Sequence, residues 1–274
     1  MIPAAFDYAR AGSVDEAVAL LAEHGDDAKL LAGGHSLLPL MKLRLATPAM
    51  LVDIGRLRDL SYVRDEGDAV AIGGLTRHRD VETSEVLLSS VPLLAAAAHQ
   101  VGDPQVRHRG TIGGSIAHGD PASDLPAVLL ALGATMVARG PGGERMVPAE
   151  DLFVSFLETA LAPEEVLVEI RVPKATGAGW SFQKFNRRAQ DWAIVGVAAA
   201  RVNGSLNVAL VNMASTPVRA SAVEAALAGG ATAVDAAQQA AEGLDPPADL
   251  NASPEYRRHL AQVLTRRALE EAGA

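Results

Sequence analysis

Two glycine pairs in this sequence stand where a polypeptide could bind phosphate groups. One lies in Ala32-Gly33-Gly34-His35-Ser36, after a short apolar stretch, and the other in Thr111-Ile112-Gly113-Gly114-Ser115. Paired glycines let a backbone approach a ligand closely, and successive amide N–H groups beside a helix N-terminus attract a phosphate. Two such loops could hold the two halves of a pyrophosphate, with the hydroxyls of Ser36, Thr111 and Ser115 as further donors.

Each glycine pair also has an explanation without a ligand, because Gly-Gly is common in tight turns. The chain has no G-x-G-x-x-G and no Walker A sequence, which disfavours a Rossmann site and a P-loop. No G-x-S-x-G motif surrounds Ser36 or Ser115, which disfavours a serine hydrolase. The histidines do not have the spacing of a metal site with an acidic partner, so no metal ligand is predicted.

Local signals place the first glycine loop inside a small β-α-β lobe. Ser13-Val14-Asp15-Glu16 is a capping box, which predicts a helix from Ser13 to about Glu23 that stops near Gly25. The short, mostly apolar stretch 29–32 predicts a strand that leads into the loop, a helix is expected after Ser36, and residues 51–54 predict the next strand. This lobe would span residues 1–55.

The remaining chain is expected to form two further lobes, residues 56–176 and 177–274. In the second lobe, strands are predicted at 69–72, 135–138 and 166–172, and helices at 91–101 and 125–132. In the third, a strand at 180–185 precedes a hairpin of 193–202 and 206–213 around Asn203-Gly204, and a last helix begins at Ser253-Pro254. The predicted fold class is α+β in three lobes, with an antiparallel sheet plus helices in the last.

Composition narrows the function classes. The formal net charge is -9, which disfavours nucleic-acid binding through overall charge. There are no cysteines, so the chain cannot ligate an iron–sulfur cluster through Cys or use thiolate chemistry. We read no signal peptide at the N-terminus and no apolar run long enough for a membrane span, and we therefore expect a cytoplasmic protein.

Six segments, in order along the chain, together resemble the medium, FAD-binding subunit of molybdenum hydroxylases. This family includes the medium subunits of carbon monoxide dehydrogenases and the flavin domain of xanthine dehydrogenases. The segments are the opening Ile2-Pro3-Ala4-Ala5-Phe6-Asp7-Tyr8, the first glycine loop with Leu37-Leu38-Pro39, the second glycine loop, Asp120-Pro121-Ala122-Ser123-Asp124-Leu125-Pro126, Phe185-Asn186-Arg187-Arg188 and Tyr256-Arg257. The resemblance covers essentially the whole chain and is far more specific than either glycine pair.

The resemblance implies the three-lobe FAD-binding fold of the molybdopterin dehydrogenase type, with both glycine loops on the FAD pyrophosphate. It implies an oxidoreductase component in a heterotrimer with an iron–sulfur small subunit and a molybdopterin-binding large subunit. Electrons would pass from two [2Fe–2S] clusters on the small subunit to FAD on this chain, and on to NAD, oxygen or a quinone. Flavin performs the chemistry, so no catalytic side chain is expected here.

Four further positions match flavin contacts of the family, and each has a structural alternative. Asp124 matches an acidic contact to the flavin nucleotide, or caps the helix that starts at Leu125. Leu167 matches an apolar flavin contact, or is a core strand residue. Lys184 matches a lysine that would stabilise reduced, anionic flavin, or is an exposed strand lysine. Trp192 stands where carbon monoxide dehydrogenase has a Tyr beside the isoalloxazine, or is a buried packing residue.

Two interpretations remain beside the main one. A self-contained flavoprotein oxidase on a related fold would need a substrate domain or a covalent flavin anchor, for which His35 is the candidate. A non-catalytic binding protein could have kept the fold, although both glycine loops are complete. The Arg107-His108-Arg109 cluster before the second loop could attract phosphate, but a solvated loop is the expectation.

Overall fold

A three-stranded parallel sheet carries the first glycine loop. In the computed structural model, which describes residues 1–274, a central strand pairs with one strand on either side. In sheet order, the strands are β1 (Asp7–Arg10), β3 (Met50–Asp53) and β2 (Ala28–Leu31). The two predicted strands are confirmed within one residue, whereas β1 was not predicted because its short sequence shows no apolar alternation. The helices are α1 (Val14–His24), the 3₁₀ turn η1 (Gly25–Asp27), α2 (Leu37–Leu43) and, after β3, η2 (Arg58–Leu60).

The capping box at the start of α1 forms largely as predicted. The Ser13 hydroxyl accepts a hydrogen bond from the Glu16 amide at 3.1 Å, and the Glu16 carboxylate accepts from the Gly12 amide at 2.7 Å. The helix ends at Gly25, which has a φ of 54° that favours glycine. These contacts define where α1 begins and ends.

A five-stranded antiparallel sheet forms the middle of the molecule. In sheet order, its strands are β4 (Val63–Asp65), β5 (Ala69–Gly73), β10 (Val166–Pro173), β6 (Thr135–Gly140) and β7 (Gly143–Pro148). A small hairpin pairs β8 (Phe153–Ser155) with β9 (Glu158–Thr159). The helices of this region are α3 (His78–Thr83), α4 (Glu85–Ser90), α5 (Pro92–His99), α6 (Pro104–Arg109), α7 (Ile112–His118), α8 (Asp124–Leu132) and α9 (Ala149–Leu152).

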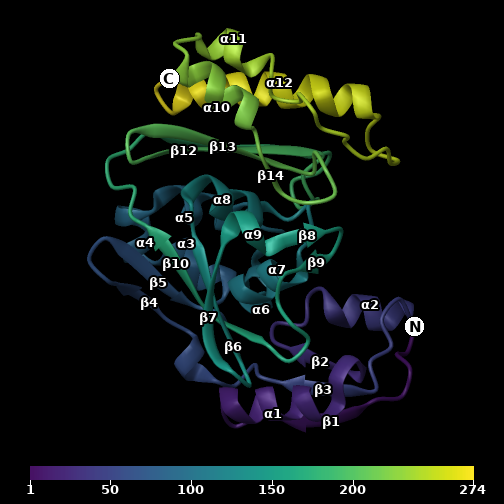
Figure 1. Cartoon of the computed structure of the whole chain (residues 1–274). Coiled ribbons are helices and arrows are strands. Elements are labelled where there is room, and N and C mark those ends of the chain that lie inside the picture. The colour runs from purple at the N-terminus through teal and green to yellow at the C-terminus, as the bar shows by residue number, and fades with distance from the viewer.

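The C-terminal region is an antiparallel sheet with helices on its outer face (Figure 1). Its strands, in order, are β11 (Trp180–Phe185), β12 (Val195–Val202), β13 (Ser205–Val211) and β14 (Val218–Arg219). The predicted hairpin is confirmed, since β12 and β13 pair around Asn203 and Gly204, which both have positive φ. Its helices are α10 (Ser221–Ala228), α11 (Ala233–Ala237) and α12 (Pro254–Glu271), which begins at the predicted N-cap Ser253.

Hydrophobic cores connect the three regions. Every residue of α8 is buried, and this helix packs on α5 on one side and on β12 and β13 on the other. The largest apolar cluster therefore includes Ile72 of the middle sheet together with Ala198 and Ala209 of the C-terminal sheet. The α+β class is confirmed, and the lobe boundaries at 55 and 176 stay predictions. No helix combines the length and the apolar character needed to cross a membrane.

The second glycine pair lies inside a helix rather than in a loop, which corrects the sequence-based expectation. Gly113 and Gly114 belong to the first turn of α7, and the Thr111 hydroxyl caps this helix by accepting from the Gly114 amide. A Cβ on Gly113 would lie 2.5 Å from the carbonyl oxygen of Gly74. Gly113 is thus required for the close contact between α7 and the turn after β5.

We predict that Gly113→Ala lowers the free energy of unfolding by roughly 1–3 kcal/mol, because two backbone segments must move apart. Thermal and denaturant unfolding measure this change. Gly142→Ala is the control, because its Cβ meets no atom within 4 Å, and a change within about 0.5 kcal/mol is expected there. Equal stability of the two variants would contradict the contact.

Candidate cofactor site

One cavity of about 440 Å³ brings together almost all of the predicted site residues. Its size is typical of small-molecule and cofactor sites. Its wall is built from six parts of the chain: the loop after β2, the first turn of α7, the start of α8, β10, β11 and the segment after β11. The predicted residues that line it are Ala32, Gly33, Gly34, His35, Ser36, Thr111, Gly113, Gly114, Ser115, Asp124, Leu167, Lys184 and Trp192.

Ile112 is the predicted residue that does not line the cavity. Its side chain is fully buried in the hydrophobic core, and its amide donates to the Thr76 carbonyl at 3.0 Å. As the first residue of α7, Ile112 anchors the helix and leaves the cavity wall to Gly113, Gly114 and Ser115.

The first glycine loop presents a row of unused hydrogen-bond donors to the cavity. The amides of Gly33, Gly34, His35 and Ser36 donate to no acceptor of the chain. Consecutive free amides at the start of a helix form a site for an anion. Gly34 has a φ of 78°, which favours glycine and turns the backbone at this point.

The second glycine pair offers fewer free donors. The Gly113 amide donates to the Gly74 carbonyl at 2.9 Å, and the Ser115 amide donates to the Thr111 carbonyl at 3.0 Å. The Gly114 amide makes only a 3.2 Å bond to the Thr111 hydroxyl. A Cβ on Gly114 would meet that hydroxyl at 2.7 Å and would lie 3.9 Å from the Cβ of Ala32. Gly114 therefore stands at the point where the two glycine segments approach each other across the cavity.

Asp124 and Lys184 form a buried ion pair in the cavity wall. The Lys184 ammonium donates to Asp124 Oδ2 at 2.7 Å and to the Gln100 carbonyl at 2.9 Å, and the two side chains are 3% and 6% exposed. The exposed-lysine alternative is therefore wrong. The helix-cap alternative for Asp124 is also wrong, because Ser123 occupies the N-cap and Asp124 is the first helical residue.

Two buried polar atoms of the cavity wall have no partner within the chain. These are Asp124 Oδ1 and His78 Nδ1. An unpaired buried polar atom is costly, and a bound ligand is one way to satisfy it. Burial, together with the charges of the nearby His35, Arg107 and Arg77, lowers the pKa of His78 to about 4, so this imidazole is neutral near pH 7.

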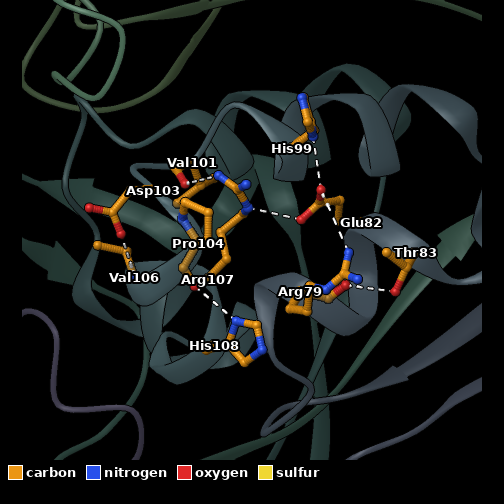
Figure 2. A network of polar contacts seen from close by, with 10 residues as sticks. All are labelled: Arg79, Glu82, Thr83, His99, Val101, Asp103, Pro104, Val106, Arg107 and His108. Atoms are coloured by element: carbon orange, nitrogen blue, oxygen red, sulfur yellow. Dashed lines mark hydrogen bonds and ion pairs between the residues drawn. The ribbon is translucent and has the colours of Figure 1, made fainter.

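An ion-pair network lies next to the cavity-lining residues Val101 and Val106 (Figure 2). Arg107 is buried, donates to Glu82 at 2.8 Å and to the Val101 carbonyl at 3.1 Å, and Glu82 also contacts His99 at 2.8 Å. The expectation of a solvated arginine cluster is wrong for Arg107, because α3 supplies a carboxylate directly opposite α6. Arg107 and Lys184 thus hold two successive carbonyls, those of Val101 and Gln100, in the segment between α5 and α6.

Two side chains provide apolar surface. Leu167 is 7% exposed and belongs both to the largest core cluster and to the cavity wall, so its two interpretations are both consistent with the structure. Trp192 is 60% exposed, which rules out the buried packing role. The backbone after Trp192 is held by the side-chain Nδ2 of Asn212, which donates to the Ala193 carbonyl at 2.8 Å, and by the buried Arg257, which donates to the Ile194 carbonyl.

Several lining residues were missed by the sequence reasoning. They are Lys29, His78, Val101 and Gly102, among others. Lys29 precedes the first loop by three residues on β2, so strand geometry alone could have suggested it. His78, Val101 and Gly102 reach the cavity only through tertiary contacts that no local pattern reveals.

Comparisons with known proteins identify the family. Residues 4–175 match the model of the FAD binding domain in molybdopterin dehydrogenase, and residues 180–272 match the CO dehydrogenase flavoprotein C-terminal domain. The chain belongs to the family of FAD-binding medium subunits of molybdenum hydroxylases. Its members are subunits of oxidoreductases, and FAD is the cofactor of the matched domain.

Individual relatives match this chain along essentially its whole length. The carbon monoxide dehydrogenase medium chain of Hydrogenophaga pseudoflava is 45% identical, with 100% of this chain and 99% of the relative covered. The 6-hydroxypseudooxynicotine dehydrogenase complex subunit alpha of Paenarthrobacter nicotinovorans is 40% identical, with 99% and 96% covered. A solved structure of carbon monoxide dehydrogenase from Hydrogenophaga pseudoflava superposes with a TM-score of 0.96 at 46% identity, with 99% and 98% covered.

The chemistry of the cavity fits FAD. Four free amides suit a pyrophosphate, the unpaired Asp124 Oδ1 suits a hydroxyl or N–H donor, and Leu167 and Trp192 offer apolar surface for a planar ring. The buried ammonium of Lys184 adds positive charge to the same wall. The pyrophosphate, a hydrogen-bond donor and a planar ring of FAD therefore each have a complementary feature among the lining residues.

We predict that FAD affinity falls as the pH drops through about 6. Burial raises the pKa of Asp124 to about 6, although the Lys184 ammonium opposes this shift. A donor of FAD bound to Oδ1 favours the carboxylate, so protonation of Asp124 competes with binding.

The raised pKa of Asp124 also affects folding. Its contribution to the free energy of unfolding is greatest below the pKa of the unfolded chain, about 4, and is lost as the pH rises through about 6.

The FAD dissociation constant, measured between about pH 5 and 8, tests this prediction. Asp124→Asn should bind FAD more weakly and lose the pH dependence around 6. His35→Gln is the control, because His35 lines the same cavity, and this variant should keep the dependence. An unchanged profile in Asp124→Asn would show that another group is responsible.

Proposed function

We propose that this chain holds FAD in the cavity described above and relays electrons from the iron–sulfur clusters of a partner subunit, through the flavin, to an external acceptor. The observation that carries the proposal is the row of four free amides, Gly33 to Ser36, beside a buried Asp124–Lys184 pair in one cavity. Flavin itself supplies the redox chemistry, and the protein supplies binding, orientation and electrostatics.

The glycine segments divide the task of binding the pyrophosphate. In this proposal, the amides of Gly33 to Ser36 donate to the phosphate oxygens, and the bare Cα of Gly114 lets the other glycine segment approach them. The hydroxyls of Ser36, Thr111 and Ser115 remain candidate donors, although Ser115 already shares a 2.8 Å hydrogen bond with Ser123. This arrangement needs no G-x-G-x-x-G loop.

The other end of the cavity would position the ring system. Leu167 and Trp192 would contact it, Asp124 would accept a hydrogen bond through Oδ1, and the buried Lys184 would favour the reduced, anionic state of the flavin. Lys184 is already neutralised in part by Asp124, so its influence on the flavin depends on the charge of that carboxylate.

We infer that another subunit of the complex selects the substrate. The medium chain of a carbon monoxide dehydrogenase and the subunit alpha of a 6-hydroxypseudooxynicotine dehydrogenase complex are 45% and 40% identical to this chain, although the molecules in these names are chemically unlike. We therefore infer an iron–sulfur small subunit and a molybdopterin-binding large subunit as partners, with NAD, oxygen or a quinone as acceptor. Cytoplasmic location stays a prediction from the sequence.

We predict that Gly114→Ala weakens FAD binding at least about tenfold, or about 1.4 kcal/mol. The added methyl group displaces the Thr111 hydroxyl and narrows the gap between the two glycine segments. Flavin released from the purified protein and its partner subunits gives the FAD content, and unfolding curves show whether the fold is kept. Gly142→Ala should retain FAD fully, and equal retention by both variants would remove Gly114 from the binding site.

The relay is tested by reconstituting substrate turnover of the complex with and without this chain. With it, substrate oxidation should reduce the flavin and sustain transfer to the external acceptor. Without it, the iron–sulfur clusters should still become reduced while transfer to the acceptor falls by a large factor. If this chain alone oxidises an aldehyde, a purine or carbon monoxide at enzymatic rates, the relay is wrong and a self-contained flavoprotein takes its place.

A further inference from the structure

A buried histidine without a hydrogen-bond partner lies in the wall of the cofactor cavity. His78 is the first residue of α3, is 4% exposed and lines the cavity. Its Nδ1 has no partner within the chain. Buried polar atoms without a partner are uncommon in folded proteins, and each needs an explanation. Because the ring borders the cavity, a bound ligand is the contact that would compensate for the missing partner.

Three contacts place His78 at the end of the cavity that holds the first glycine loop. Its amide donates to the Gly110 carbonyl at 3.0 Å, and a Cβ on Gly110 would lie 2.7 Å from Cδ2 and 3.0 Å from Nε2 of the imidazole. Gly110 in turn meets the loop, since a Cβ on Gly33 would lie 3.0 Å from the Gly110 Cα. The charge of His35, in the same loop, is close enough to lower the pKa of His78. The imidazole therefore lies beside the free amides.

The ring offers one uncharged donor at this place. With its pKa lowered to about 4 by burial and by neighbouring positive charges, the imidazole of His78 is neutral near pH 7. A neutral imidazole carries one N–H donor and one acceptor nitrogen. The free amides beside it are donors, so the ligand that they attract presents acceptor oxygens and negative charge. The N–H group of the ring is the part that matches such a ligand.

We infer that His78 donates its ring N–H to a phosphate oxygen of FAD, as a further donor beside the amides of Gly33 to Ser36. The inference rests on the proposed function, because it requires FAD in this cavity. Packing alone does not explain a histidine here, since an apolar side chain of similar size would fill the same space without an unpaired polar atom. A hydrogen bond to a charged acceptor also contributes more than one between neutral groups.

The test compares two ligands in the full chain freed of flavin. FAD carries the pyrophosphate, the ribityl chain and the ring system, whereas ADP carries only the adenosine and its phosphates. His78→Leu removes the donor, while His78→Asn and His78→Gln keep an N–H group near the position of Nδ1 and of Nε2, respectively. His108→Gln is the control, because this exposed histidine does not line the cavity. Dissociation constants for both ligands and unfolding curves are measured for each variant.

We expect His78→Leu to weaken the binding of FAD and of ADP by a similar factor, at least about tenfold. Either His78→Asn or His78→Gln should recover affinity to within about threefold of the wild type, and His108→Gln should bind both ligands normally. In the wild type, addition of ADP should shift the nitrogen NMR signals of the His78 ring. This last measurement needs no substitution and decides the matter if His78→Leu fails to fold.

Normal affinity of His78→Leu for both ligands, or unshifted ring signals in the wild type saturated with ADP, would overturn the inference and leave FAD binding standing. Weaker FAD binding with unchanged ADP binding would also overturn it, because the ring would then contact the ribityl chain or the isoalloxazine. A loss that neither amide variant relieves would assign His78 to packing and contradict the donor role. If the wild type binds no FAD, the proposed function itself fails.

Discussion

The buried ion pair between Asp124 and Lys184 holds the walls of the cofactor cavity together. Asp124 begins α8, which is buried between the middle and the C-terminal sheets, and Lys184 lies on β11. Two charges removed from water are stable only when nearly all of their hydrogen bonds are satisfied. Lys184 meets this condition through Gln100, and Asp124 meets it on one oxygen only. The pair therefore ties three segments of the chain to one point and leaves one acceptor for a ligand.

The four glycines of the two glycine pairs are needed for different physical reasons. Gly113 is needed because α7 contacts the backbone of Gly74, and a Cβ on Gly33 would collide with the Arg109 carbonyl. Gly34 is needed for its positive φ. Only Gly114 has neither a close backbone neighbour nor a positive φ that explains it. The sequence left tight packing and ligand approach as alternatives for each glycine pair. In the structure, tight packing accounts for Gly33 and Gly113, and ligand approach stays a prediction for Gly114.

Local patterns were sufficient for elements whose signals are contained in a few adjacent residues. The Ser13 cap, the Asn203-Gly204 hairpin and the Ser253 cap formed as predicted, since each depends on backbone geometry set by its own side chains. Thirteen of the fourteen predicted site residues line the cavity, and four of them, Asp124, Leu167, Lys184 and Trp192, were predicted only through the family resemblance. Local patterns failed where a distant partner decides the outcome, as for Arg107, whose charge is buried against Glu82 of another helix. They also failed for Ile112, because the sequence does not show that α7 turns this side chain into the core.

We propose that the free amides of the first glycine loop bind the FAD pyrophosphate. Hydrogen exchange, resolved at individual amides with and without FAD, measures this contact at each residue. The amides of Gly33, Gly34, His35 and Ser36 have no acceptor in the chain and should exchange rapidly in the apo protein. FAD should slow their exchange strongly, while the Gly113 amide, already bonded to Gly74, should change little. Rapid exchange at all four amides in a protein saturated with FAD would contradict the account.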